Sequence, residues 1–163
     1  KSPIRFGRIS SRFSRKRFHP ILKLHRAHLG VDYAAPIGTP VRTVGAGAVV
    51  LAAWHGGGGR TIKIRHNSTY QTSYLHLSRF ESGIRAGVKV AQGQVIGFVG
   101  TSGLSTGAHL HFEFAQNGRV LDPLSQKFPS ADPVPPDRLA DFQTQAAALL
   151  GSLPAWESAA NTN

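Results

Sequence analysis

The sequence predicts an all-β domain followed by a short helix near its C-terminal end. Short runs of β-branched and apolar residues are separated by glycine at intervals of about ten residues, which is typical of strands joined by turns. The stretch GAHLHFEF, residues 107–114, alternates apolar with polar residues, as a strand with one buried face does. The 163 residues, of which 40% are hydrophobic, suffice for one core.

Residues 39–54 and 61–66 are predicted to form a hairpin. Both segments have the composition of strands, and the sequence HGGGG forms a flexible connection between them. Residues 87–100 and residues 38–50 share one pattern, in which glycine stands on both sides of short Val/Ile strands. We interpret this similarity as a weak internal echo.

The predicted strand at 107–114 places its polar residues on one face. Because successive side chains of a strand point to opposite faces, His109, His111 and Glu113 lie together. The other face carries Leu110, Phe112 and Phe114. On this evidence alone, a solvated sheet edge explains the polar face equally well.

The segment YQTSYLHL, residues 70–77, is predicted to be a further strand. By the same alternation, one of its faces carries Tyr70, Thr72, Tyr74 and His76.

The composition changes near residue 129, so we expect two parts. Residues 1–128 form the main domain with a basic N-terminal segment, and residues 129–163 form a Pro-rich linker, a helix and a disordered tail. Asp137 is a candidate helix cap, and the helical run extends to Leu150. The first residues, KSPIRFGRIS, include neither an initiator Met nor a signal peptide, so we expect a trimmed part of a longer protein with possible additional domains.

The chain is strongly basic, with a formal net charge of +11, and it contains no cysteine. Nine of the 19 Lys and Arg residues precede the first acidic residue, Asp32, which favours a polyanionic partner. Nucleic acid is the weaker interpretation, because no nucleic-acid-binding motif accompanies the charge. No apolar run reaches the length of a transmembrane segment. Any metal must be bound by His, Asp or Glu.

His28 and Asp32 lie four residues apart in HRAHLGVDYAAP, where Gly30, Val31 and Pro36 argue against a helix. In an extended strand they would be about 13 Å apart, too far for two ligands with bonds of about 2 Å. We therefore expect a bend, which Gly30 allows at low cost. A zinc site needs three N or O ligands and an open position. His28, Asp32 and one histidine of the HLH strand supply that set, and the other histidine then faces the water as an acid or base.

Three motifs occur in the order HLGVD (28–32), YLHLS (74–78) and SGLSTGAHLHFEF (102–114), accompanied by RFHP (17–20) and NGRVLDP (117–123). Together they resemble peptidase family M23, the lysostaphin-type or LytM zinc metallopeptidases, which cleave peptide bridges of bacterial peptidoglycan. The resemblance covers about residues 10–125. It implies an antiparallel two-sheet fold with the cleft between loops.

The resemblance also implies roles for single residues. One Zn²⁺ is expected to be bound by His28, Asp32 and His111, while His76 and His109 line the catalytic water and the substrate carbonyl. The implied function is a zinc-dependent endopeptidase for peptidoglycan cross-links. We favour the bond from D-Ala to meso-diaminopimelate over glycine bridges, hence a DD-endopeptidase in the periplasm or cell envelope of a Gram-negative bacterium, with secretion as the alternative.

Further residues have weaker assignments. Arg12 and Arg17 are candidates to bind substrate carboxylates, with simple surface charge as the alternative. His19 is expected to shape a loop near the cleft, with a substrate contact as the alternative, and Tyr74 is a further candidate for substrate contact. Glu113 either orients an imidazole or is a surface carboxylate. The remaining histidines, His25, His55 and His66, are expected to face solvent.

Three other functions fit parts of the sequence less well. A non-catalytic, peptidoglycan-binding LytM-type regulator would lack ligands, but the full set is present here. A biotinyl- or lipoyl-type carrier domain would explain the internal echo, but it needs a lysine at a hairpin tip, and Lys89 lies inside a strand-like run. A basic nucleic-acid-binding module would explain the charge and leave the His/Asp pattern without a purpose.

Overall fold

The computed structural model describes residues 2–5, 7–19, 24–126 and 136–152, without the side chains of 17–19, 24–26, 136 and 150–152. The chain divides into two units, Lys1–Gln126 and Lys127–Asn163. The first unit contains every described strand, and the second contains the described helix α1. No helix among the described residues is both long and apolar enough to cross a membrane.

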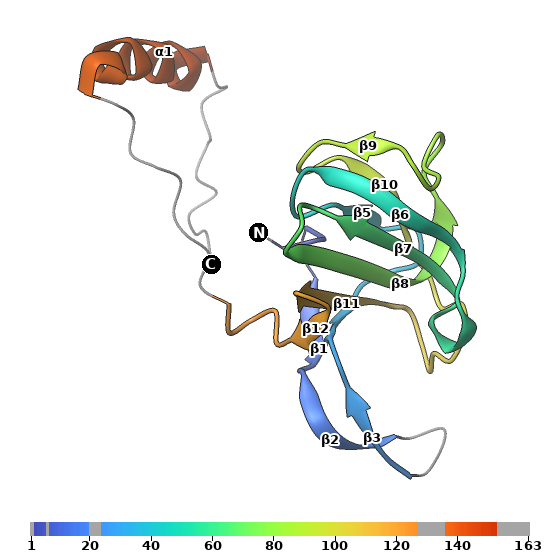
Figure 1. Ribbon diagram of the computed structural model, residues 1–163. Helices are drawn as coiled ribbons and strands as arrows, with labels where there is room; N and C mark the ends of the chain where they lie inside the picture. Colours follow the sequence, from blue (N-terminus) through green and yellow to red (C-terminus); the bar gives the residue numbers. More distant parts are fainter. Residues whose placement is uncertain (1, 6, 20–23, 127–135, 153–163) are drawn as a thin grey trace, which may run out of the picture. The chain divides into compact units, whose positions relative to one another are not determined.

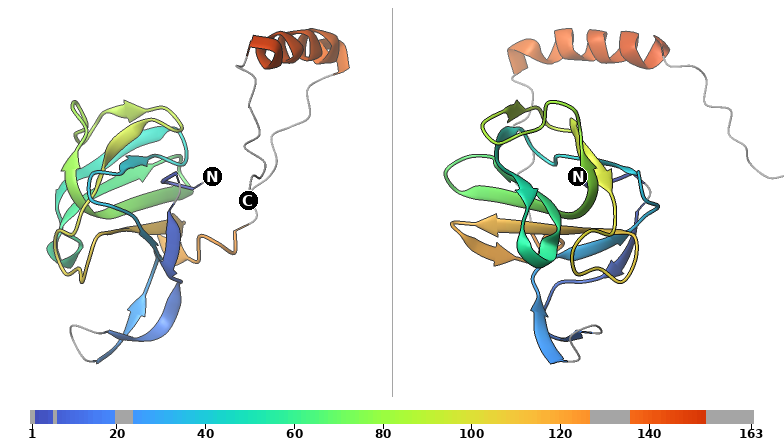
Figure 2. Two further views of the ribbon diagram at one scale, coloured as in Figure 1. Left: turned by 180° about the vertical axis from the view of Figure 1, so that it is seen from behind. Right: turned by 90° about the vertical axis from the view of Figure 1, so that its right-hand side faces the viewer.

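The described strands form two antiparallel sheets (Figure 1). Ten strands make the larger sheet, in the order β1-β4-β11-β8-β7-β6-β9, with β12 paired to β11 and with β10 paired to β5 and β8. Strands β2 and β3 make a separate ribbon, which projects away from the larger sheet (Figure 2). The strands are β1 (Arg8–Ser11), β2 (Ser14–His19), β3 (Leu24–His28), β4 (Val31–Ala34), β5 (Pro40–Arg42), β6 (Gly47–Trp54), β7 (Arg60–Arg65), β8 (Tyr70–Phe80), β9 (Lys89–Val90), β10 (Val95–Val99), β11 (His109–Gln116) and β12 (Arg119–Leu121).

The predicted hairpin is confirmed, because β6 and β7 pair antiparallel around a short 3₁₀ turn at Gly56–Gly58. The two segments of the internal echo pair with each other, β5 with β10 and β6 with β9. The prediction of an all-β antiparallel fold with a short C-terminal helix is therefore confirmed.

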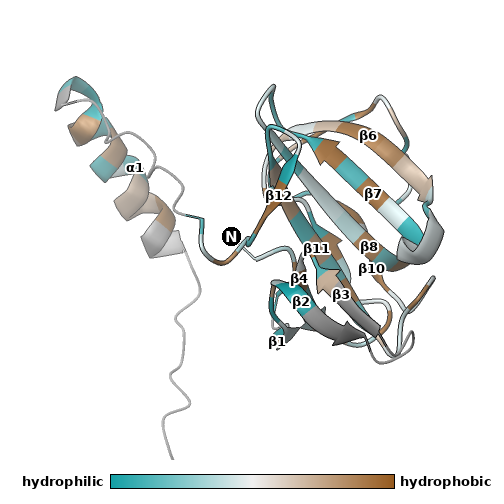
Figure 3. Ribbon diagram, turned by 60° about the horizontal axis from the view of Figure 1, so that its bottom comes forward, coloured by the Kyte–Doolittle hydropathy of each residue, from teal (hydrophilic) through white to brown (hydrophobic). Residues whose placement is uncertain are grey.

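The core lies on one face of strands whose apolar residues alternate with polar ones, as Figure 3 shows along β7 and β11. On β7, Ile62 and Ile64 are fully buried, and Lys63 and Arg65 point to the other face. Each fully buried residue of this size contributes about 1.5–3 kcal/mol through the hydrophobic effect. The core therefore fixes which residues face the opposite side of the sheet.

Strand β11 follows the predicted alternation. Leu110, Phe112 and Phe114 are buried in the core, and His109, His111 and Glu113 lie together on the other face. β11 is inserted between β4 and β8, with His111 opposite Asp32 on one side and opposite Leu75 on the other. The register thus brings a histidine and an aspartate side by side.

Strand β8 departs from the prediction at His76. Thr72 and Tyr74 are buried in the core, but His76 lines the cleft on the other face together with Leu75. His76 has a φ of 61°, in the left-handed region, and β8 carries one extra residue there, because Tyr74 pairs with Ile62 and Leu77 with Arg60. This β-bulge turns the side chain of His76 away from the core.

The bulge lies where one edge of β8 changes partner. β11 pairs with β8 along Tyr70–Leu75, and β10 pairs with Leu77–Phe80. Leu77 pairs with β7 on one side and with β10 on the other. β10 therefore lies on the same side of β8 as β11 and pairs with β8 beyond the end of β11. His76 therefore lies at the junction between two partner strands.

In the second unit, a 3₁₀ turn at Pro136–Arg138 leads into α1 (Leu139–Ser152). This agrees with the helix predicted after Asp137. Leu139, Phe142 and Leu149 are exposed. The disordered tail predicted for the last residues lies outside the described part of the chain.

Candidate metal centre and catalytic cleft

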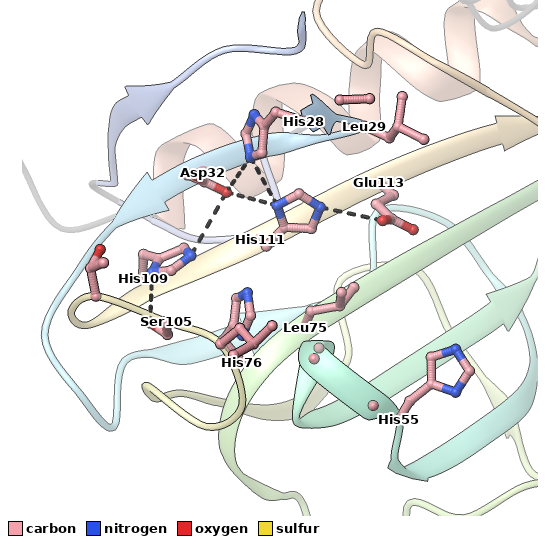
Figure 4. Close-up of a pocket in the computed structure, with 16 residues that line it drawn as sticks. His28, Leu29, Asp32, His55, Leu75, His76, Ser105, His109, His111 and Glu113 are labelled. Carbon is pink, nitrogen blue, oxygen red and sulfur yellow. Dashed lines mark hydrogen bonds and ion pairs between the residues drawn. The ribbon is translucent and has the colours of Figure 1, made fainter. Parts of the chain in front are cut away.

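A cleft of about 520 Å³ lies over the polar face of β11 and β8. Its floor carries the histidines of these strands, His28 from β3 and Asp32 from β4, and its walls come from the loops at 55–58 and 104–106 (Figure 4). Leu29, Leu75 and Leu104 add apolar surface to the lining. The cleft thus combines convergent polar groups with an apolar wall, as ligand sites commonly do.

Three electron-rich atoms meet at one point of the floor. His28 Nε2 lies 2.9 Å from Asp32 Oδ1 and 3.1 Å from His111 Nδ1, and His111 Nδ1 lies 2.7 Å from Asp32 Oδ1. Ligand atoms at about 2.0–2.2 Å from one ion lie within about 4 Å of one another. The cluster of His28, Asp32 and His111 therefore fits a metal site.

Hydrogen bonds to the outer ring nitrogens prepare the two histidines for this role. His28 Nδ1 lies 2.8 Å from the carbonyl oxygen of Arg12, and His111 Nε2 lies 3.3 Å from Glu113 Oε1. Both partners only accept hydrogen bonds, so each histidine donates from its outer nitrogen and, in its neutral form, presents a lone pair on the inner one. Two lone pairs and a carboxylate then face the same point, which favours a cation there.

The charges of the cluster reinforce each other. Burial raises the pKa of Asp32, but hydrogen bonds with His111 and His28 outweigh burial and hold that pKa well below its ordinary value. Burial lowers the pKa of His111, yet hydrogen bonds to Asp32 and Glu113 raise it to about 9, so without a metal this ring holds a second proton, which a bound cation displaces. Asp32 is thus a permanent carboxylate at neutral pH, and the site attracts positive charge.

Gly30 is needed at the turn between β3 and β4 for a different reason from the one predicted. Its φ lies outside the left-handed region, so the bend itself does not require glycine. A Cβ at this position would lie 2.6 Å from both His111 Nε2 and the carbonyl oxygen of Phe112. Glycine is required because the turn packs directly against the metal-site histidine.

Two more histidines face the cluster across the cleft. His76 Nδ1 lies 2.8 Å from the carbonyl oxygen of Ser102, and His109 Nδ1 lies 2.8 Å from that of Gly107. Each therefore donates from Nδ1 and leaves Nε2 free to face the cleft. The two rings lie 4.8 Å apart between centroids, and His109 Nε2 lies 3.8 Å from Asp32 Oδ1.

The environment of His76 favours its neutral form. Burial lowers its pKa to about 4, and the hydrogen bond to Ser102 only partly opposes this. At neutral pH the Nε2 lone pair of His76 is therefore available to accept a proton.

The wall beside His76 is formed by two glycine-rich loops that pack against each other. The Ser102 hydroxyl donates to the Leu77 carbonyl and accepts from the Arg60 amide, at 2.8 and 2.9 Å. Gly103 has a φ of 76°, and a Cβ there would lie 2.4 Å from the carbonyl oxygen of Gly57. The close contact of these loops fixes the carbonyl that orients His76.

The weaker sequence assignments have different outcomes. The Tyr74 side chain is fully buried, and its hydroxyl accepts a hydrogen bond from the Val44 amide, so the expected substrate contact is wrong. The alternation that grouped Tyr74 with His76 is broken by the bulge. Arg12 is exposed and does not line the cleft, but its carbonyl orients His28. The side chains of Arg17 and His19 lie outside the described part of the structure.

The structure shows the contact predicted for Glu113, confirms that His55 is exposed to solvent and corrects the expectation for His66. Glu113 orients His111. His55 is exposed but lines the cleft, and His66 is held between the Ala46 carbonyl and the Thr72 hydroxyl. The side chain of His25 is not among those that the structure describes.

Some groups of the site could not be found from residue types. The carbonyl oxygens of Arg12, Ser102 and Gly107 orient three histidines, and a backbone carbonyl leaves no mark in a sequence. The cleft walls come from the glycine-rich stretches HGGGG and SGLSTG, and this glycine content is the sequence signal from which the walls could have been predicted.

Comparison with known proteins identifies the family. The model of peptidase family M23 matches residues 26–123, which include all five histidine and aspartate residues of the cleft floor. The chain belongs to peptidase family M23. Among its relatives, the peptidoglycan DD-endopeptidase ShyA of Vibrio cholerae is 44% identical over 135 residues, which make up 83% of this chain and 31% of ShyA.

Two further proteins, one of them a solved structure, are similar to this chain. The DD-carboxypeptidase/endopeptidase Mpg of Neisseria meningitidis is 44% identical over 154 residues, 93% of this chain and 35% of Mpg. The crystal structure of a zinc-containing peptidase from Vibrio cholerae has a TM-score of 0.72 and 38% identity, and covers 78% of this chain and 39% of that one. The chain spans about a third of the length of the two curated relatives.

Proposed function

We propose that this M23 chain is a zinc-dependent endopeptidase that hydrolyses the peptide cross-links of bacterial peptidoglycan, at the bond from D-Ala to meso-diaminopimelate. The observation that carries the proposal is the convergence of His28 Nε2, Asp32 Oδ1 and His111 Nδ1, within 2.7–3.1 Å of one another, on the floor of an open cleft. Two relatives whose names include endopeptidase activity, ShyA and Mpg, support this bond class.

The donor set fits Zn²⁺, because two neutral imidazoles and one carboxylate are ligands that zinc accepts in catalytic sites. His28, Asp32 and His111 would hold the ion. When bound, Zn²⁺ polarises a carbonyl oxygen and lowers the pKa of a water from 15.7 towards about 7. The similar Vibrio cholerae structure is that of a zinc-containing peptidase, which supports this choice of metal.

His76 and His109 handle protons in this proposal. Both present Nε2 to the space above the cluster, fixed by their Nδ1 hydrogen bonds to Ser102 and Gly107. A neutral imidazole there accepts the proton of the attacking water and returns it to the leaving amine, while the second imidazole, when it carries a proton on Nε2, donates a hydrogen bond to the developing oxyanion.

The test is digestion of defined muropeptide dimers, with mass analysis of the products. The set contains dimers joined directly from D-Ala to meso-diaminopimelate and dimers joined by glycine bridges. We expect the chain with zinc to convert only the direct dimers to monomers, and a chelator to stop the reaction. His111→Ala serves as the inactive control. Binding of sacculi without any cleavage would instead support a non-catalytic regulator.

The place of action follows from the substrate. We propose that the protein works outside the cytoplasm, in the periplasm of a Gram-negative bacterium, and that nucleic acid is not its partner. The Vibrio and Neisseria sources of ShyA and Mpg support this placement. Fractionation of cells that make the native protein tests it, and recovery with the cytoplasmic fraction would contradict it.

A further inference from the structure

A second hollow, of about 280 Å³, lies beside the catalytic cleft on the same sheet. Glu113 lines both the cleft and the hollow, so the two spaces adjoin at this residue. In Figure 4, Glu113 lies on the opposite side of His111 from His109. The lining of the hollow includes two cationic side chains, Lys63 and Arg65, from β7.

The register of the sheet fixes how these cations lie relative to the metal cluster. His111 and Leu75 form one cross-strand row, and Glu113, Ser73 and Lys63 form the next. The third row consists of Ala115, Gln71 and Arg65. Residues two apart on a strand share a face, and successive rows lie about 6.6–6.8 Å apart. Lys63 and Arg65 therefore project from the same face as His111, one and two rows along.

These two positive charges form no ion pair with an acidic side chain among the described residues. The ion pairs there all involve His28, His109 or His111, and none includes Lys63 or Arg65. Glu113 shares the row of Lys63 and is attracted by its charge without forming an ion pair, but its closest charged partner is His111, so the two cations of the hollow face a single carboxylate. Lys63 Nζ lies 3.4 Å from His55 Nε2, which carries no negative charge. The hollow is thus prepared for an anion.

We propose that Lys63 and Arg65 form a subsite for a carboxylate of the peptide whose scissile bond lies at the metal cluster. This rests on the proposed function, because the stem peptides of peptidoglycan carry free carboxylates. An extended peptide advances about 3.4 Å per residue, so a carboxylate two to four residues from the scissile bond reaches the second and third rows. The Arg65 guanidinium can bind it with two parallel N–H groups, and the Lys63 ammonium adds a point charge.

The test compares two synthetic cross-linked stem peptides that differ only in their side carboxylates, free in one and amidated in the other. It uses three proteins with zinc: the parent, the double variant Lys63→Gln/Arg65→Gln, and the control Lys89→Gln/Arg119→Gln. The control removes one Lys and one Arg that are exposed on β9 and β12 and line neither the cleft nor the hollow. Thermal unfolding checks that all three are folded.

We expect the parent to cleave the free-carboxylate peptide about tenfold more efficiently than the amide, mainly through KM, because charge-assisted hydrogen bonds at partly exposed sites have modest strength. The double variant should lose this preference, with a ratio of kcat/KM near one, while its kcat/KM for the amide stays unchanged. The control should keep the preference of the parent. An equal preference in parent and double variant would overturn the subsite.

Equilibrium binding of an uncrosslinked stem peptide, free or amidated, to the same three proteins separates this inference from the proposed function. Cleavage of neither dimer by the parent would overturn the proposed function. In that case the binding ratio still decides the subsite: a preference for the free carboxylate that disappears only in the Lys63→Gln/Arg65→Gln variant supports it, and any other pattern overturns it.

Discussion

Strands β11 and β8 are neighbours in the sheet and both contribute histidines to the cleft, but they place them by different means. On β11, regular alternation points His109 and His111 to the cleft and points Leu110 and Phe112 to the core on the other face. On β8, His76 reaches the cleft through a bulge with a φ of 61°. Regular pairing therefore positions the candidate ligand His111 together with His109, while a local irregularity positions the proton acceptor His76.

The largest expected effect separates the roles of the histidines. His28→Ala or His111→Ala should lose both metal and hydrolysis, because each removes an atom of the three-atom cluster. His76→Ala or His109→Ala should keep the metal and lower hydrolysis by about 10²–10⁴-fold. Elemental analysis and muropeptide digestion measure the two effects. Retention of metal by His111→Ala together with its loss in His109→Ala would reverse the assignment on β11.

A second variant tests how tightly β11 is packed at its ligand. Gly30→Ala should destabilise the fold by about 2–3 kcal/mol and weaken metal binding, because its Cβ would lie 2.6 Å from His111 Nε2 and from the Phe112 carbonyl. Gly107→Ala is the matched control, since a Cβ there meets nothing within 4 Å. Denaturant unfolding measures both. Equal stability of the two variants would contradict the packing argument.

A smaller effect is expected from the residue that orients His111. Glu113→Gln keeps an oxygen that can accept the hydrogen bond from His111 Nε2 but removes the charge. We expect metal affinity to fall by about tenfold, the low end for such a partner. Competition with a chelator of known affinity measures it. Ser105→Ala, at the lip of the cleft and distant from this bond, should leave the affinity unchanged.

The smallest effect tests the irregularity of β8. His76→Val should be less stable than His76→Gly by about 1–2 kcal/mol, because a β-branched residue is strained at positive φ and glycine is not. At the neighbouring Leu75, in regular strand conformation, the order should reverse, with Leu75→Val more stable than Leu75→Gly. Denaturant unfolding of the four variants measures this. The same order at both positions would remove the distinction between the two strands.

The difference between the strands also explains what the sequence could predict. Alternation predicted the faces of His109, His111 and Glu113, because the Leu and Phe residues between them must be buried in the core. The helix after Asp137 was predictable from its composition, although Asp137 itself lies inside the 3₁₀ turn that precedes α1. Family motifs, rather than spacing, singled out His111 over His109.

Other features depend on contacts between distant residues, so no local pattern reports them. The side of His76 depends on one positive φ, which histidine adopts only because the surrounding loops hold it through Ser102. The need for glycine at position 30 arises from His111, far along the chain. Tyr74 was misassigned because its polar group finds partners inside the core, at Val44 and Thr72.

Because β11 is inserted between β4 and β8, the protein can complete its metal site only late in its synthesis. His28 and His111 are separated by 83 residues of chain, and Asp32 and His111 by 79. A nascent chain that stops before β11 therefore holds two of the three ligand atoms, and its β4 and β8 lack the strand that joins them. Because metal affinity and folding are coupled in such sites, we expect tight binding to begin only when β11 has left the ribosome. Hydrolysis of peptide bonds is then unavailable to any shorter synthesis product.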